Sequence, residues 1–213
     1  MPSPPRAAGA LTDTLVLEAT IRQECERLDD EAVGYRLTHE PKLLPIVQLV
    51  KDGDVTLATE NYIVHQTNCI TTRAAGLAKY VFHKWSRADT YTNRQQPAQP
   101  DTNDLCESGS HKQFIVNMNA QYYPGPPRPG NIDSRHHRVR YFAQCLRALA
   151  RHIREHQHQH CGVAIPWRIG CGLAMGEWRT YASLIMHWAK ATRTRNGQSI
   201  QVTVYQLPPQ DKT

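Results

Sequence analysis

The sequence has no long apolar run. Its apolar stretches, such as Tyr62 to Val64 and Phe114 to Val116, are only a few residues long, whereas a helix that crosses a bilayer needs about 20 apolar residues. The first ten residues contain one arginine and no apolar core behind it, so we expect no secretory signal peptide. The sequence therefore predicts no membrane partner and favours an intracellular protein, cytoplasmic or nuclear.

The sequence also lacks paired cysteines. Its six cysteines are scattered and form no Cys-x-x-Cys pair, which predicts reduced thiols rather than a disulfide framework. The tract HIREHQHQHC places His152 and His156 on one helix face but lacks a second ligand pair at standard spacing. We therefore expect no metal site.

A dense basic run interleaved with aromatic residues is missing too, so the sequence carries only a weak nucleic-acid signal. Lysine and arginine number 25 against 19 aspartates and glutamates, which gives a net charge of +6. This excess favours an anionic partner, such as a phosphate-bearing ligand, without identifying it. The 213 residues suit one domain core plus an extension, and we expect a monomer.

The chain divides by composition. Residues 1–10 are rich in proline and alanine and predict a mobile tail. Residues 11–40 predict a helical extension, because Leu15, Leu17, Ala19, Ile21 and Leu28 sit among charges after the candidate N-caps Thr12 and Asp13. Residues 41–208 form the predicted main domain, with an insert at about 87–112, and residues 209–213 a tail.

Within the main domain, short β-branched runs alternate with helical patterns. We expect strands at 45–50, 61–68, 112–119, 161–167 and 199–207, and helices at 74–85, 135–158 and 177–192. The polar segment 86–111 and the stretch 122–134, which holds four prolines, are expected to be loops. This alternation predicts an α/β fold in three layers, α/β/α, around a mixed, largely parallel sheet.

The most informative loop is RIGCGLAMG, which lies between a predicted strand and a helix that begins near Glu177. Its glycines let backbone N–H groups approach a phosphate closely, and the helix start adds a favourable positive end. No GK[ST] follows it, and it has no downstream acidic partner on a strand, so kinase and dehydrogenase fingerprints are not matched. An ordinary glycine-rich turn is the alternative.

Two further elements come earlier in the chain. In HQTNCITTRAAGLAKY a strand again gives way to a polar loop and a helix, where Asn68 could bind a ribose hydroxyl and Arg73 an anion. In KDGDVT, Asp54 follows a glycine after the first strand. An ordinary helix cap and a structural turn are the alternatives.

Gly53-Asp54-Val55, the strand IVHQTN and RIGCGLAMGEW, in this order, resemble the macrodomain family. RIGCGLAMGEW is similar to the phosphate loop of the terminal ADP-ribose protein glycohydrolase branch and its bacterial relatives. VHQTN, GLAKYVF and VTVYQL resemble the yeast-type ADP-ribose 1''-phosphate phosphatase. The likeness covers about Leu44 to Leu207 without the insert, and it implies a macrodomain-like fold that binds ADP-ribose and needs no cofactor.

The resemblance also implies a set of site residues. Asp54 would bind the adenine amino group, Asn68 would face the distal ribose, and Tyr205 would stack on adenine. Residues 72–77 and 169–174 would form two loops around the ribose and the diphosphate. Together with Asn119, which ends a strand, the expected ligand-binding residues are Asp54, Val55, Asn68, Thr72, Arg73, Ala75, Gly76, Leu77, Asn119, Ile169, Gly170, Cys171, Gly172, Leu173, Ala174 and Tyr205.

Catalysis is less clearly indicated. The glycohydrolase branch uses a lysine and an aspartate where this chain has Asn117 or Met118 and Ala174, which argues against a covalent lysine route. The phosphatase resemblance points to His65, and Glu177 could position water beside the distal ribose. A core histidine and a helix-start carboxylate are the structural alternatives.

Three hypotheses follow. The first is a hydrolase that removes ADP-ribose, or a phosphate from its distal ribose, by metal-independent water attack. The second is a binding module for free or macromolecule-linked ADP-ribose, with nucleic acid involved only as the ADP-ribosylated substrate. The third is a basic RNA-binding protein, whose affinity would fall steeply with salt.

Overall fold

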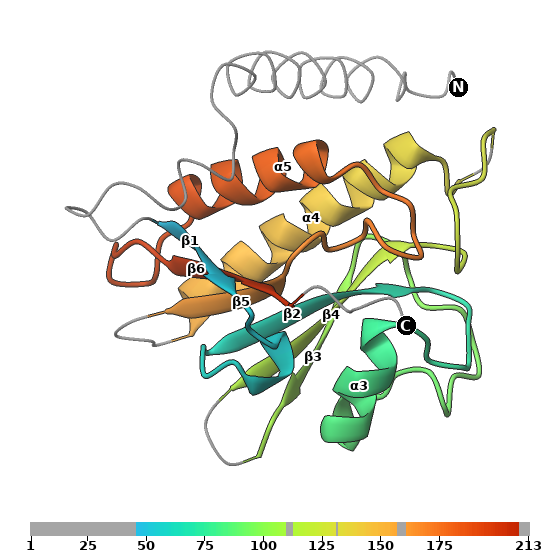
Figure 1. Cartoon of the computed structure of the whole chain (residues 1–213), viewed down its shortest axis with the longest axis horizontal. Coiled ribbons are helices and arrows are strands. Elements are labelled where there is room, and N and C mark those ends of the chain that lie inside the picture. Colours follow the sequence, from blue (N-terminus) through green and yellow to red (C-terminus); the bar gives the residue numbers. More distant parts are fainter. Residues whose placement is uncertain (1–45, 110–112, 131, 157–160, 209–213) are drawn as a thin grey trace, which may run out of the picture.

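The structure, a computed structural model, describes residues 46–109, 113–130, 132–156 and 161–208. The predicted tail 1–10, the helical extension 11–40 and the tail 209–213 lie outside these residues. The described chain builds a six-stranded sheet in the order β1-β6-β5-β2-β4-β3 (Figure 1). The strands are β1 (Val47–Lys51), β2 (Tyr62–Asn68), β3 (Asn103–Glu107), β4 (Phe114–Gln121), β5 (Gly162–Pro166) and β6 (Gln201–Gln206).

The helices cover both faces of this sheet. Figure 1 shows α4 (Arg135–Glu155) and α5 (Trp178–Ala191) on one face and α3 (Leu77–Lys84) on the other. Short 3-10 helices span Val55–Leu57 (η1) and Ser86–Ala88 (η2). All strand pairs are parallel except β3 with β4. The predicted three-layer α/β fold with a mixed, largely parallel sheet is confirmed.

Burial on both faces explains the apolar strand sequences. Every residue of β4 is buried, and β2 is buried at all positions but Gln66. Tyr62 and Val64 pack toward α4 and α5, whereas Ile63 packs toward α3. A strand covered on both faces needs apolar side chains in succession rather than in alternation.

The polar segment after α3 differs from its prediction as a surface loop. Residues 103–107 form β3, which pairs antiparallel with β4 at the edge of the sheet. The residues of β3 are half-buried or exposed, so the strand carries little of the apolar pattern that sequence reasoning relies on. Within this same segment Tyr91 is 3% exposed and packs edge-on against Phe82 of α3.

Among the described residues, no helix combines the length and the apolar character that crossing a bilayer requires.

Candidate functional site

Three loops meet at one edge of the sheet. The first loop (69–76) follows β2, the proline loop (122–134) follows β4, and the glycine loop (167–177) follows β5. Because β5, β2 and β4 are adjacent and parallel, their carboxyl ends lie side by side. The loops line a cavity of about 360 Å³, and we call it the loop cavity.

The glycine loop turns its backbone sharply. Arg168, Gly170 and Met175 have φ of 57°, 71° and 52°, a region that residues other than glycine adopt only at a cost. The Gly176 N–H donates to the Gly170 carbonyl at 2.9 Å and closes the loop. Within the described part of the chain, the N–H groups of Gly172, Leu173 and Ala174 make no hydrogen bond. These residues line the cavity, so their N–H groups are available to an anion.

Asn68 organises the first loop. Its Oδ1 accepts hydrogen bonds from the N–H groups of Ile70 and Thr71, at 3.2 and 2.9 Å. Its Nδ2 and its backbone N–H both donate to the Tyr91 hydroxyl oxygen, at 2.9 and 2.8 Å. Arg94 donates from Nη1 to the Asn68 carbonyl at 2.8 Å. The segment after α3 therefore buttresses the first loop.

Tyr91 itself lines the loop cavity. Its oxygen accepts two N–H groups from Asn68, which leaves its own O–H proton free to donate toward a ligand. Burial raises the pKa of Tyr91 to about 12. The phenol therefore stays protonated, as a donor, throughout the physiological pH range.

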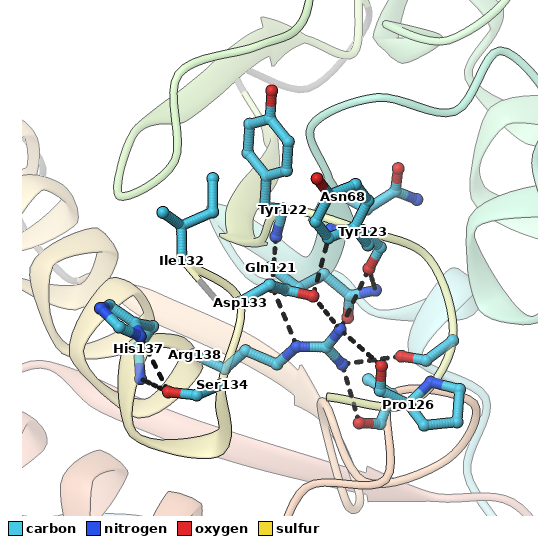
Figure 2. A network of polar contacts seen from close by, with 12 residues as sticks. Asn68, Gln121, Tyr122, Tyr123, Pro126, Ile132, Asp133, Ser134, His137 and Arg138 are labelled. Atoms are coloured by element: carbon cyan, nitrogen blue, oxygen red, sulfur yellow. Dashed lines mark hydrogen bonds and ion pairs between the residues drawn. The ribbon is translucent and has the colours of Figure 1, made fainter. Parts of the chain in front are cut away.

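A buried ion pair joins the proline loop to the glycine loop. Asp133 and Arg138, which are 0% and 2% exposed, form this pair (Figure 2). Asp133 accepts from the N–H groups of Tyr122 and Tyr123, at 2.6 and 3.2 Å. Asp133 thus holds the start of the proline loop, and Arg138 neutralises the charge of the Asp133 carboxylate.

Arg138 also donates to four carbonyl oxygens. Three belong to the proline loop, those of Gly125, Tyr123 and Pro126, at 2.7, 3.2 and 3.1 Å. The fourth belongs to Ala174 of the glycine loop, at 3.0 Å. Gly125 and Ala174 line the cavity. One planar guanidinium therefore sets the spacing of two cavity walls, because its donors have a fixed geometry.

The charge of the loop cavity has one sign. Among the described residues that line it, the charged ones are Arg73 and Arg168, both exposed, and none is acidic or a histidine. Gln66 and Gln121 add side-chain amides, with Gln66 Nε2 donating to Gln121 Oε1 at 2.7 Å. Such a lining suits an anionic ligand.

The structure brings most of the expected ligand-binding residues to this cavity. Both predicted loops contribute, and a Cβ built on Gly76 would lie 3.2 Å from Leu173 Cδ1, so the loops touch. Their part in ligand binding stays a prediction. The expected residues that line the cavity are Asn68, Arg73, Ala75, Gly76, Leu77, Ile169, Gly170, Gly172, Leu173 and Ala174.

The expected adenine residues do not line the loop cavity. Asp54 Oδ1 accepts from the Thr56 N–H at 2.8 Å and caps η1, and Val55 is buried in the core beneath α3. Tyr205 donates its hydroxyl to the Glu60 carboxylate at 3.0 Å. These residues lie at the same sheet edge but beyond Trp167, whose N–H donates to the Tyr205 carbonyl at 2.7 Å.

Three more expected residues are placed elsewhere. Thr72 is exposed and outside the cavity lining. Cys171 turns inward, with Sγ 3.3 Å from the Ile169 carbonyl, and burial raises its pKa to about 11. Asn119 is fully buried and ties the strands together, since it accepts from Thr67 Oγ1 at 2.9 Å and donates to Asp104 Oδ2 at 3.0 Å.

His65 does not reach the loop cavity. It is 1% exposed, its ring meets Phe82 edge-on, and its Nε2 lies 2.5 Å from Asn117 Oδ1. Because Asn117 Nδ2 donates to the Ala88 carbonyl at 2.8 Å, its Oδ1 must accept, and His65 Nε2 carries the proton. Burial lowers the pKa of His65 to about 4. The position corresponds to the core-histidine alternative.

Glu177 also lies off the cavity. It is exposed at the start of α5 and accepts from Thr180 Oγ1 at 3.0 Å. Its side chain makes no N-cap hydrogen bond to the helix. Asn117 and Met118, one of which stands where a covalent route would need its lysine, are fully buried and do not line the cavity.

Sequence reasoning missed several cavity residues. Trp167 lines the cavity directly before the glycine loop and packs on Trp178, with ring centroids 4.8 Å apart. The sequence pattern predicts only a strand end at Trp167 and a surface loop around Tyr91. Thr71, expected in the anion-binding loop, and Gln121, expected to line the distal-ribose pocket, do line the cavity. The other missed lining residues are Gln66, Thr67, Ala78, Pro124, Gly125, Pro166 and Arg168. Among the residues that the structure describes, no three His, Cys, Asp or Glu side chains gather as metal ligands.

Solved macrodomains share this fold. The chain matches the macrodomain of Thermus aquaticus DarG at 18% identity and TM-score 0.53, over 76% of this chain and 99% of that one. It matches the Trypanosoma brucei macrodomain, solved in complex with ADP-ribose, at 10% identity and TM-score 0.53, over 79% and 68%. A mutant Oceanobacillus iheyensis macrodomain matches at 14% identity and TM-score 0.50, over 76% and 84%.

No protein-family model and no curated protein sequence matches the chain. The evidence of similarity is therefore structural, and at these identities it concerns the fold and not a particular branch. With its strand order, its three layers and its loop cavity in place, the chain has a macrodomain-like α/β fold.

Proposed function

We propose that this protein binds ADP-ribose, free or attached to a macromolecule, in the loop cavity. The observation that carries the proposal is the lining itself: unpaired N–H groups of the glycine loop, two arginines and no acidic residue among the described lining residues. A diphosphate carries two negative charges that such donors stabilise. The T. brucei macrodomain of similar fold was solved with ADP-ribose, which supports this choice of anion.

The proposal assigns parts of the ligand to parts of the lining. The diphosphate lies against Gly172, Leu173 and Ala174, and the start of α3 adds the N–H groups of its first turn. Trp167 offers an aromatic face for adenine, in place of the expected Tyr205. Asn68 and Tyr91 lie on the side where the distal ribose would sit.

Titration calorimetry with ADP-ribose tests the proposal. We expect saturable binding to one site per chain, with competition by ADP and none by adenosine at the same concentration. Arg73→Ala and Arg168→Ala should each weaken binding several-fold, by roughly 1 kcal/mol per exposed charge. Arg87→Ala, which removes an exposed arginine off the cavity, is the matched control. The absence of any heat of binding at high micromolar ADP-ribose would contradict the proposal.

Binding without turnover is the function that the lining favours. Water attack needs a base that takes a proton within hydrogen-bond reach of the reacting atoms. None of the described lining residues is acidic or a histidine, and neither His65 nor Glu177 lines the cavity. Incubation with ADP-ribose 1''-phosphate and with an ADP-ribosylated protein or DNA separates the two functions. Product release that is lost on Glu177→Gln, with binding retained, would restore the hydrolase hypothesis.

A further inference from the structure

A second hollow lies on the outer side of the α4 and α5 layer. We call it the helix groove, and its volume is about 430 Å³. α4 and α5 lie side by side over one face of the sheet (Figure 1). Apolar side chains of both helices form much of its lining, which comprises Ala143, Leu146, Arg147, Ala150, Arg151, Arg154, Leu184, His187, Trp188, Ala191 and Thr192.

One rim of the helix groove is basic. Arg147, Arg151 and Arg154 follow one another at spacings of four and three residues, so they form a row along α4. All three are exposed, and none pairs with a carboxylate in the described part of the chain. None of the described residues that line the groove is acidic. An occupant of this groove should therefore be apolar on one side and acidic beside it.

Trp188, one of the residues that line the helix groove, carries an unsatisfied donor. Trp188 is 8% exposed, and its Nε1 is buried without a hydrogen-bond partner. A buried N–H group that lacks an acceptor destabilises the protein that contains it. An oxygen supplied by a segment seated in the groove would remove this cost.

We propose that residues 11–36 of this same chain occupy the helix groove as an amphipathic helix. Within this segment Leu17, Ile21, Cys25, Leu28 and Ala32 recur every three or four residues and form one apolar stripe. The segment carries seven carboxylates against three arginines, a net charge of −4 in a chain whose net charge is +6. Its apolar stripe and its charge both complement the groove.

The connection is long enough for the segment to reach its own groove. β1 begins at Val47, which pairs with Val202 near the start of β6, and β6 follows α5. Ala191 and Thr192, at the end of α5, line the groove. The ten residues 37–46 span up to about 33 Å when extended. No second copy of the chain is required.

Amide hydrogen exchange of the full chain, read by mass spectrometry, tests this inference. We expect residues 11–36 to exchange at least about tenfold more slowly than a free peptide of the same sequence. Arg147→Glu with Arg151→Glu should abolish this protection. Adding Glu24→Arg and Glu31→Arg, which lie seven residues apart beside the stripe, should restore it.

One control and one further groove variant complete the test. Lys79→Glu with Arg87→Glu reverses two exposed charges near α3, on the opposite face, and should leave the protection unchanged. Ala150→Phe fills the groove without changing charge and should also remove the protection. Free-peptide exchange rates in the unaltered chain, or protection that survives both groove variants while circular dichroism shows a folded chain, overturn the inference. Protection that requires a dimeric mass assigns the segment to a second copy and overturns it equally.

Discussion

At the residue scale, Arg138 is the side chain on which the two cavity walls depend. Its guanidinium reaches four carbonyl oxygens and the Asp133 carboxylate. Lysine keeps the charge but not the planar set of donors, so Arg138→Lys leaves carbonyls of both loops unsatisfied. We expect a loss of roughly 2–3 kcal/mol in unfolding free energy and weaker ADP-ribose binding, measured by urea denaturation and calorimetry.

The control for this prediction is Arg135→Lys, an exposed arginine in the first turn of the same helix. It should change neither stability nor affinity. If Arg138→Lys instead lowers stability but leaves affinity unchanged, the ion pair supports the core alone and does not space the cavity walls.

His65 predicts a pH dependence of stability. Burial lowers its folded-state pKa to about 4, below the ordinary value of 6.5. Between these values the unfolded chain binds more protons than the folded chain, so stability falls as the pH drops from 6.5 to 4. A difference of about 2.5 pKa units corresponds to about 3 kcal/mol at most.

Substitution of His65 isolates this contribution. His65→Gln keeps a side-chain N–H donor for Asn117 but removes the titration. Between pH 6.5 and pH 4, the unfolding free energy of the unaltered chain should fall by about 3 kcal/mol more than that of His65→Gln. Urea denaturation at each pH measures this difference. Parallel pH profiles for the two proteins would contradict the assignment.

At the element scale, the glycine loop depends on two positions for different reasons. Gly170 has a φ of 71°, and a Cβ there would lie 2.5 Å from Gln66 Oε1 and 2.7 Å from the Tyr181 ring. A Cβ at Gly172 would meet nothing within 4 Å, and Gly172 lines the cavity. Substitutions at Gly170 and Gly172 therefore separate a steric effect on the fold from a steric effect on ligand binding.

We expect Gly170→Ala to lower stability and binding together, whereas Gly172→Val should weaken ADP-ribose binding with little change in the melting temperature. Gly197→Ala is the control for backbone strain, because Gly197 has a φ of 77° and open space around its Cβ position. It should cost about 1–2 kcal/mol, and Gly170→Ala should cost more. Thermal denaturation and calorimetry distinguish the three variants.

At the scale of the whole molecule, charge should govern affinity. The protein carries a net charge of +6, and both arginines that line the loop cavity are exposed. Exposed charges are screened as salt rises, so ADP-ribose affinity should fall by roughly three- to tenfold between 0.05 and 0.5 M salt. The slope of log Kd against log salt should be markedly shallower for Arg73→Ala. RNA binding that is steeper in salt and indifferent to ADP-ribose would favour the nucleic-acid hypothesis.

The type and position of most elements along the chain could be predicted from local patterns, whereas contacts between distant elements could not. Val47, Phe142 and Val202 lie in runs whose periodicity identified their strands and helix, and all three are buried. β3 was missed because an edge strand needs little apolar character. Tyr91 and Trp167 were missed because nothing in their own segments shows that each faces a cavity built from other strands.

The sequence by itself determined the α/β class, the positions of the two loops and the absence of a Walker or dinucleotide fingerprint, because periodicity and glycine spacing are local properties. The tertiary structure alone decided that Asn68 and Gly172 line one cavity and that Asp54 and His65 do not line it. It also decided that Arg138 spans two loops. Side-chain direction and burial depend on which strands become neighbours, and strand order is a property of the whole chain.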